Sequence, residues 1–184
     1  MEWGHRWARL FDDLEAASQA QARRELDSEI ADRTRRERAR IPLIERLCAH
    51  RGAHLQLRLV GGARANGTLV DVGVDWLALA PSASRGLVVP LGAVASASGL
   101  TARSEAGASA RRFLLGSALR EISRDRLPAQ VTDRFGSSYT GTIDVVGADF
   151  LDLAEHPVDE ARRSANVRSV RTLPFTSLAS VQTG

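Results

Sequence analysis

The chain has 184 residues and a formal net charge of +3, a length that suits one ordinary domain or two small ones. A hydrophobic content of 43% is enough to build cores. Its 25 basic side chains, histidine aside, are all arginines, so the pI near 10.2 overstates the basicity. Charge alone therefore does not mark the chain as a dedicated polyanion binder.

Residues 3–40 are mostly helix formers and predict a helical arm. Five large apolar residues recur near its start at helical spacing and predict one apolar stripe. We expect this stripe to contact a partner protein, a second copy of the arm, or the rest of the chain. The partner-binding candidates are Trp3, Trp7, Leu10, Phe11 and Leu14. The segment "RTRRERAR" that follows is charged on every face.

A short helix is expected within residues 41–52, with Pro42 in its first turn and Gly52 at its end. The period then changes to two, which predicts five short strands. They are "HLQLRLV" at 54–60, "GTLVDVG" at 67–73, "WLALA" at 76–80, "LVVP" at 87–90 and "AVASAS" at 93–98. Strands this short favour a small barrel, because closure removes exposed edges.

Residues 99–110, "GLTARSEAGASA", have the composition of a linker, and residues 111–126 predict a second amphipathic helix. Five more strands are expected at 129–135, 136–147, 149–155, 171–175 and 177–182. The segments "GTLVDVGVDWLALA" at 67–80 and "GTIDVVGADFLDLA" at 141–154 match closely, which indicates a unit used twice. The expected fold is mainly β with α: an arm at 1–41, a five-stranded barrel with its leading helix at 42–99, a linker at 100–110 and a second such barrel at 111–184.

A short helix followed by five strands resembles the Sm and Sm-like fold. The resemblance covers residues 41–99 and 111–184 and depends on the Gly-x-Asp-aromatic turns at 73–76 and 147–150 and on "VPL" and "LPF". The whole chain also resembles a family of two-barrel proteins of unassigned activity from high-GC Gram-positive (actinobacterial) species. The resemblance implies that Asp75 and Asp149 stand at the acidic position of the RNA-binding third loop. The Asn and the basic pair that complete that site are absent, and SH3-like barrels that bind proteins fit the strand pattern nearly as well.

Two kinds of residue are candidates for binding nucleic acid. Trp76 and Phe150 each begin a strand, where an aromatic ring either stacks on a base or closes one end of a core. Arginines gather in the loop at 155–171, which also carries acidic residues. The basic candidates are Arg85, Arg162, Arg163, Arg168 and Arg171.

Catalytic and metal-binding patterns are missing from the sequence. Cys48 is the single cysteine, and the four histidines have no ligand spacing. No nucleophile elbow or phosphate-binding glycine loop occurs, and we expect no cofactor. The opening residues are charged and no apolar run suits a membrane span, so a cytoplasmic, soluble protein is expected.

The sequence therefore predicts a non-enzymatic binding protein that forms a homo-oligomer. The leading hypothesis is a nucleic-acid-associated regulator, with RNA favoured over DNA, that contacts phosphates through arginine. The alternative is a protein–protein adaptor or assembly scaffold that docks through the Trp-bearing helix.

Overall fold

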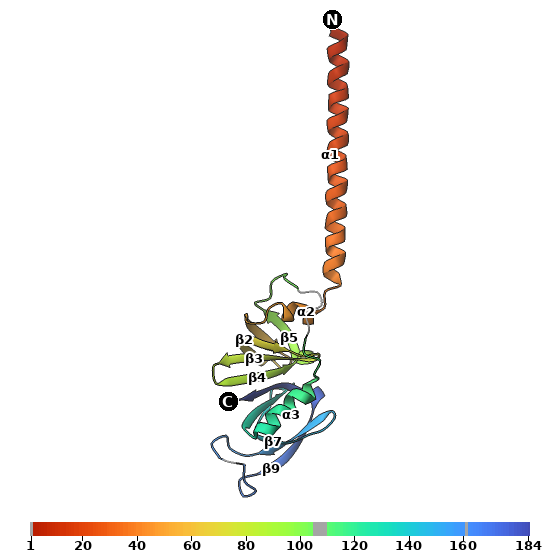
Figure 1. The fold of residues 1–184 in the computed structure, drawn as a ribbon. Coiled ribbons are helices and arrows are strands. Elements are labelled where there is room, and N and C mark those ends of the chain that lie inside the picture. Colours follow the sequence, from red (N-terminus) through yellow and green to blue (C-terminus); the bar gives the residue numbers. More distant parts are fainter. Residues whose placement is uncertain (1, 105–109, 161) are drawn as a thin grey trace. The chain divides into compact units, whose positions relative to one another are not determined.

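The computed structural model describes the backbone of residues 2–104, 110–160 and 162–184. Within the first helix it describes side chains at 15, 18, 19 and 21 and from 23 onward. The chain divides into two compact units, Met1–Ile41 and Pro42–Gly184 (Figure 1).

The first unit is the helix α1, Glu2–Ala39, which agrees with the predicted arm. Its described side chains are almost all exposed, including the apolar Leu26 at 56% and Ile30 at 55%. Ion pairs on its surface, such as Arg33 with Glu37, are exposed to solvent and add little to the stability of the helix. Among the described residues, no helix combines the length and the apolar character needed to cross a bilayer.

The second unit contains a ten-stranded antiparallel sheet in the part of the chain that the structure describes. The first five strands are β1 His54–Leu59, β2 Arg64–Val72, β3 Trp76–Ser82, β4 Arg85–Pro90 and β5 Val94–Ser98. The others are β6 Pro128–Asp133, β7 Ser138–Val146, β8 Phe150–Glu155, β9 Ser169–Pro174 and β10 Leu178–Thr183. Every predicted strand is therefore present, within a few residues at each end. Strand β1 alternates exposed and buried residues as its period of two requires.

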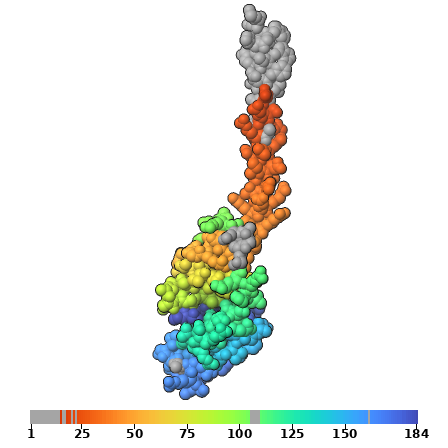
Figure 2. Space-filling view, viewed as in Figure 1, coloured from red at the N-terminus to blue at the C-terminus, as the bar shows by residue number. Residues whose placement is uncertain are grey.

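The strand order is β5-β1-β2-β3-β4-β10-β6-β7-β8-β9. Strand β10 hydrogen-bonds to β6 on one side and to β4 on the other, with Val181 opposite Val88. In Figure 2 the dark blue of β10 accordingly emerges between the yellow-green and the turquoise parts of the molecule. The sheet thus has a first half, β1–β5, and a second half, β6–β10, and β10 joins the two.

The prediction of two tandem five-stranded Sm-like or SH3-like barrels, built as an internal repeat, is wrong. A closed first barrel would need β5 to pair with β4. The edge of β4 that does not face β3 is instead hydrogen-bonded to β10. The sheet stays open, and within the described residues β5 and β9 stand at the two ends of the order. The physical reason is that β10 satisfies the backbone donors and acceptors that closure would have used.

The hydrophobic cores also cross between the halves. Ala179 of β10 packs in the cluster formed mainly by β1–β4. Trp76 of β3 packs in the cluster formed mainly by β6–β10, together with the half-buried Ala78 and Val88. The two halves therefore do not have independent cores, which agrees with one compact unit from Pro42 to Gly184.

Two helices and two 3-10 turns complete the described part of this unit: α2 Leu43–Cys48, α3 Leu115–Asp125, η1 Leu91–Ala93 and η2 Phe175–Ser177. Helix α3 packs on β7, as Figure 1 shows, and buries Leu115 and Leu119. Ser123 donates a hydrogen bond of 2.9 Å from its hydroxyl to the Ile143 carbonyl of β7. The predicted helix at 111–126 is confirmed but begins later, and Phe113 precedes it.

A buried carboxylate organises the turn between β6 and β7. Oδ1 of Asp133 accepts the N–H groups of Phe135 and Ser137, each at 2.9 Å, and Oδ2 accepts the Tyr139 hydroxyl at 3.1 Å. Burial acts to raise the pKa of Asp133, but these donors outweigh it, so the pKa lies below the usual aspartate value. The ionised form therefore stabilises the folded state.

Asp133→Asn is expected to lower the free energy of unfolding at pH 7 by about 1–3 kcal/mol, because the N–H groups of Phe135 and Ser137 then share a weaker, uncharged acceptor. A lowered folded-state pKa contributes stability above the unfolded pKa and loses it as pH falls through the folded pKa. The difference between wild type and variant should thus shrink below about pH 4. Urea denaturation at pH 7, 5 and 3 measures it. A difference independent of pH would contradict this role of the carboxylate.

Candidate binding groove

A groove of about 700 Å³ lies in the second unit between strands β2–β4 and helix α3. Its apolar lining includes Trp76 and Ala78 of β3, Val88 of β4 and Ala118 of α3. Two exposed apolar side chains stand at its rim, Val70 at 57% and Phe113 at 56%. A volume of this size falls in the range of sites that bind ligands or side chains of a partner.

Trp76 forms the most buried part of the groove and is only 6% exposed. Its indole Nε1 donates a hydrogen bond of 3.0 Å to the Phe113 carbonyl, and the Val74 N–H points to the same oxygen at 3.4 Å. A Cβ at Gly73 would lie 2.1 Å from Nε1, so only glycine lets the ring approach the turn. The Trp76 ring is therefore held by its hydrogen bond to Phe113 and by its close packing on Gly73.

The carboxylate of Asp75 holds the segment before α3 in place. Its Oδ1 accepts the Leu115 N–H at 2.8 Å, while its backbone carbonyl accepts the Leu91 N–H at 2.8 Å. Leu115 is the first residue of α3, so an acidic group from the turn between β2 and β3 stabilises the positive end of this helix. The backbone of Arg111 adds a bridge to Gly73 and donates to the Val72 carbonyl at 2.8 Å. One wall of the groove is thus tied to the turn between β2 and β3.

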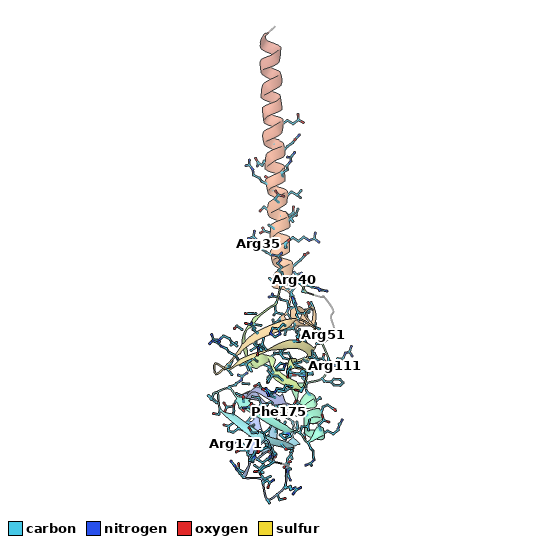
Figure 3. All side chains as sticks on the ribbon, turned by 90° about the vertical axis from the view of Figure 1, so that its left-hand side faces the viewer. Arg35, Arg40, Arg51, Arg111, Arg171 and Phe175 are labelled. Carbon is cyan, nitrogen blue, oxygen red and sulfur yellow. The ribbon has the colours of Figure 1, made fainter. Side chains whose placement is uncertain are left out.

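Charged side chains line the edges of the groove. Asp71 pairs with Arg111 and also lies 3.7 Å from Arg51, and Figure 3 shows these two labelled arginines close together. On α3, Arg124 pairs with Glu121 at 2.8 Å, and both side chains are about 70% exposed. Such exposed pairs rearrange at little cost. The groove therefore offers an apolar interior and a rim whose charges can exchange partners.

The two aromatic residues named as candidates for base stacking or core packing differ in burial. Trp76 is buried and hydrogen-bonded, as described above. Phe150 is half-buried at the start of β8, where a Cβ on Gly147 would lie 2.3 Å from its ring. Trp76 thus packs in a core cluster, whereas Phe150 packs against the turn before its own strand.

The arginines predicted to bind phosphate differ in their surroundings. Arg162 pairs with Asp144, with Nε 2.9 Å from Oδ1, and this bond raises the pKa of the guanidinium. Arg171 pairs with Glu155, which raises its pKa, and its guanidinium lies 4.3 Å from the Tyr139 ring centroid. Arg85, Arg163 and Arg168 are exposed. Arg162 and Arg171 are thus already paired with carboxylates on β7 and β8.

The predicted partner-binding side chains on the arm, Trp3, Trp7, Leu10, Phe11 and Leu14, lie outside the described residues. Sequence reasoning missed the groove, because its lining comes from four separate segments. Two signals were present: the adjacent apolar pair Leu69 and Val70, which breaks the alternation of β2, and Phe113 beside two arginines.

No cluster of three or more potential metal ligands occurs among the described residues. The lining of the groove combines apolar side chains with Asp71, Glu121 and three arginines. A comparison with protein-family models finds none that matches this chain, and a search of curated proteins finds no match either.

Proposed function

We propose that this chain is a non-enzymatic protein-binding adaptor, whose groove between β2–β4 and α3 holds an apolar segment of a partner. The observation that carries the proposal is the combination of a 700 Å³ apolar hollow with exposed Val70 and Phe113 at its rim. Apolar side chains that remain exposed around a hollow are typical of protein-binding surfaces.

The groove fits a peptide segment better than a nucleic acid. Its interior is aliphatic and aromatic, whereas nucleic acid affinity comes mainly from contacts to phosphates. Its three arginines lie beside two carboxylates, Asp71 and Glu121, so its small positive excess is far from the clustered basic charge typical of nucleic-acid surfaces. Binding of RNA or DNA at the exposed Arg163 and Arg168 stays a separate prediction.

The test compares the same substitution at two strand valines whose side chains are exposed to a similar degree. Val70→Glu places a carboxylate at the rim of the groove, and Val170→Glu makes the same change on β9, outside it. Val70 is 57% exposed and Val170 is 61% exposed, so both variants should fold. Tagged full-length chains are purified from the cells that naturally make the protein, and bound proteins are quantified.

We expect Val70→Glu to retain less than about a tenth of the bound partner, the scale of a lost hot spot, and Val170→Glu to retain all of it. The ratio of absorbance at 260 and 280 nm and a nuclease treatment are recorded in parallel. Equal capture by the two variants would reject the groove as the binding site. Release of the partner by nuclease would show that nucleic acid, not the groove, holds it.

A further inference from the structure

We propose that the groove of one chain binds the N-terminal segment of α1, residues 2–15, from a second copy of the chain. This inference rests on the proposed function, because it names the occupant of the same groove. Such a contact would make the protein self-assembling, with an arm of one copy held by the sheet of another.

The segment has the apolar content that the groove requires. The backbone of α1 is helical from Glu2 onward. The sequence places five large apolar residues at spacings of three, four and one within it, which gives one side of a helix. They are Trp3, Trp7, Leu10, Phe11 and Leu14. Tryptophan and phenylalanine bury the largest areas at protein interfaces and dominate their energetics.

The charges of the two surfaces are complementary. The segment carries four acidic residues, Glu2, Asp12, Asp13 and Glu15, against two arginines. The groove carries Arg111, Arg120 and Arg124 against two carboxylates. Arg124 is paired only with its exposed neighbour Glu121 among the contacts described for it, so an incoming carboxylate can take its place. The acidic end of the segment thus suits the arginine-bearing side of α3.

The length of α1 holds the segment away from the end of its own helix. At 1.5 Å per residue, residues 3–14 lie about 38–54 Å along the helix from its end at Ala39. No proline or glycine interrupts the helix after Gly4, so the segment stays at this distance from Ala39. Binding to a second copy, unlike binding within one chain, makes the mass of the assembly depend on concentration.

The experiment measures the mass of full-length chains by light scattering and sedimentation at about 1–100 µM, a range in which specific protein contacts form. Three variants are compared with wild type: Val70→Glu in the groove, the arm double variant Trp3→Ala with Trp7→Ala, and the control Val170→Glu. We expect wild type and control to associate, and the groove and arm variants each to associate at least about tenfold more weakly. Unfolding curves verify that the variants fold.

The decisive measurement mixes the groove variant with the arm variant. The groove-variant chain keeps an intact arm and the arm-variant chain keeps an intact groove, so one complete contact forms between them. We expect the mixture to associate although each variant alone does not. A mixture that stays monomeric, a Val70→Glu chain that associates like wild type, or a monomeric wild type would each overturn the inference. Association that depends on the tryptophans but not on Val70 would show pairing between arms instead.

Failure here is distinguishable from failure of the proposed function. If the arm double variant still captures a different protein from cells and Val70→Glu does not, the groove binds a partner and only its identity as a second copy is rejected. If neither variant changes the captured proteins or the mass, both proposals are rejected.

Discussion

Trp76→Ala is expected to lower the free energy of unfolding by about 3–5 kcal/mol, the usual cost of deleting a buried aromatic side chain. The effect should be large because Trp76 lies on β3 but packs in the core formed mainly by β6–β10. Its removal leaves a cavity between the two halves of the sheet and takes a donor from the Phe113 carbonyl. Guanidinium denaturation followed by circular dichroism measures the change.

Trp76→Phe is the matched control, because it keeps an aromatic ring but has no N–H group. Its expected cost is nearer 1 kcal/mol, the typical contribution of one hydrogen bond, plus the smaller ring volume. If Trp76→Ala cost no more than Trp76→Phe, the ring would not be part of the shared core. Two separate transitions in the wild type would show that the halves unfold independently, contrary to their mixed cores.

Gly141→Ala is the second change with a large expected effect, about 3 kcal/mol, the upper end of the usual cost of overpacking, because the backbone itself must move. A Cβ at Gly141 would lie 2.0 Å from the Ala154 carbonyl oxygen and 2.9 Å from the Glu155 Cα. Both atoms belong to the backbone of the neighbouring strand β8, so they cannot turn aside. Strand β7 and strand β8 would have to separate locally.

Gly86→Ala provides the comparison on another strand of the same sheet. There a Cβ would meet only the Thr183 hydroxyl oxygen at 3.3 Å, which is the end of a rotatable side chain. We expect a cost below about 1 kcal/mol. Thermal unfolding of both variants under one condition checks the ranking. A Gly86→Ala variant that lost as much stability as Gly141→Ala would contradict the explanation by close approach.

The local structure was predictable because it depends on neighbouring residues. Alternation in "HLQLRL" predicted β1 and its buried face, and the period of 3.6 after Arg111 predicted α3. Turns at Gly61 and Gly136 have positive φ values of +88° and +89°, which glycine adopts without strain. These signals fix the conformation of each segment without reference to the rest of the chain.

The arrangement of the strands was not predictable in the same way. Alternation specifies which face of a strand is buried, but the hydrogen-bonding edge of any strand accepts any other. Nothing in the residues of β4 distinguishes β5 from β10 as its neighbour. The pairing of β4 with β10, in which Val88 lies opposite Val181, joins positions far apart in sequence and leaves one open sheet in place of two closed barrels.

The groove escaped prediction for a related reason. Asp75 and Leu115 are 40 positions apart, as are Asp71 and Arg111, and their contacts bring the segment before α3 against β2 and β3. Trp76 was predicted either to stack on a base or to close a core, and in the structure it is buried in a core cluster. Its partner Phe113 was expected on the helix face and instead lies outside the helix, at the rim of the groove.

The position of β10 between β4 and β6 has a consequence for synthesis on the ribosome. Strand β4 ends at Pro90, but its neighbour begins at Leu178, so translation must continue through nearly 90 further residues before the two can pair. At translation rates of about 5–20 residues per second, this interval is roughly 4–18 s. During that time the nascent chain exposes an unpaired strand border, which makes this interval the period of greatest risk for misassembly with neighbouring polypeptides.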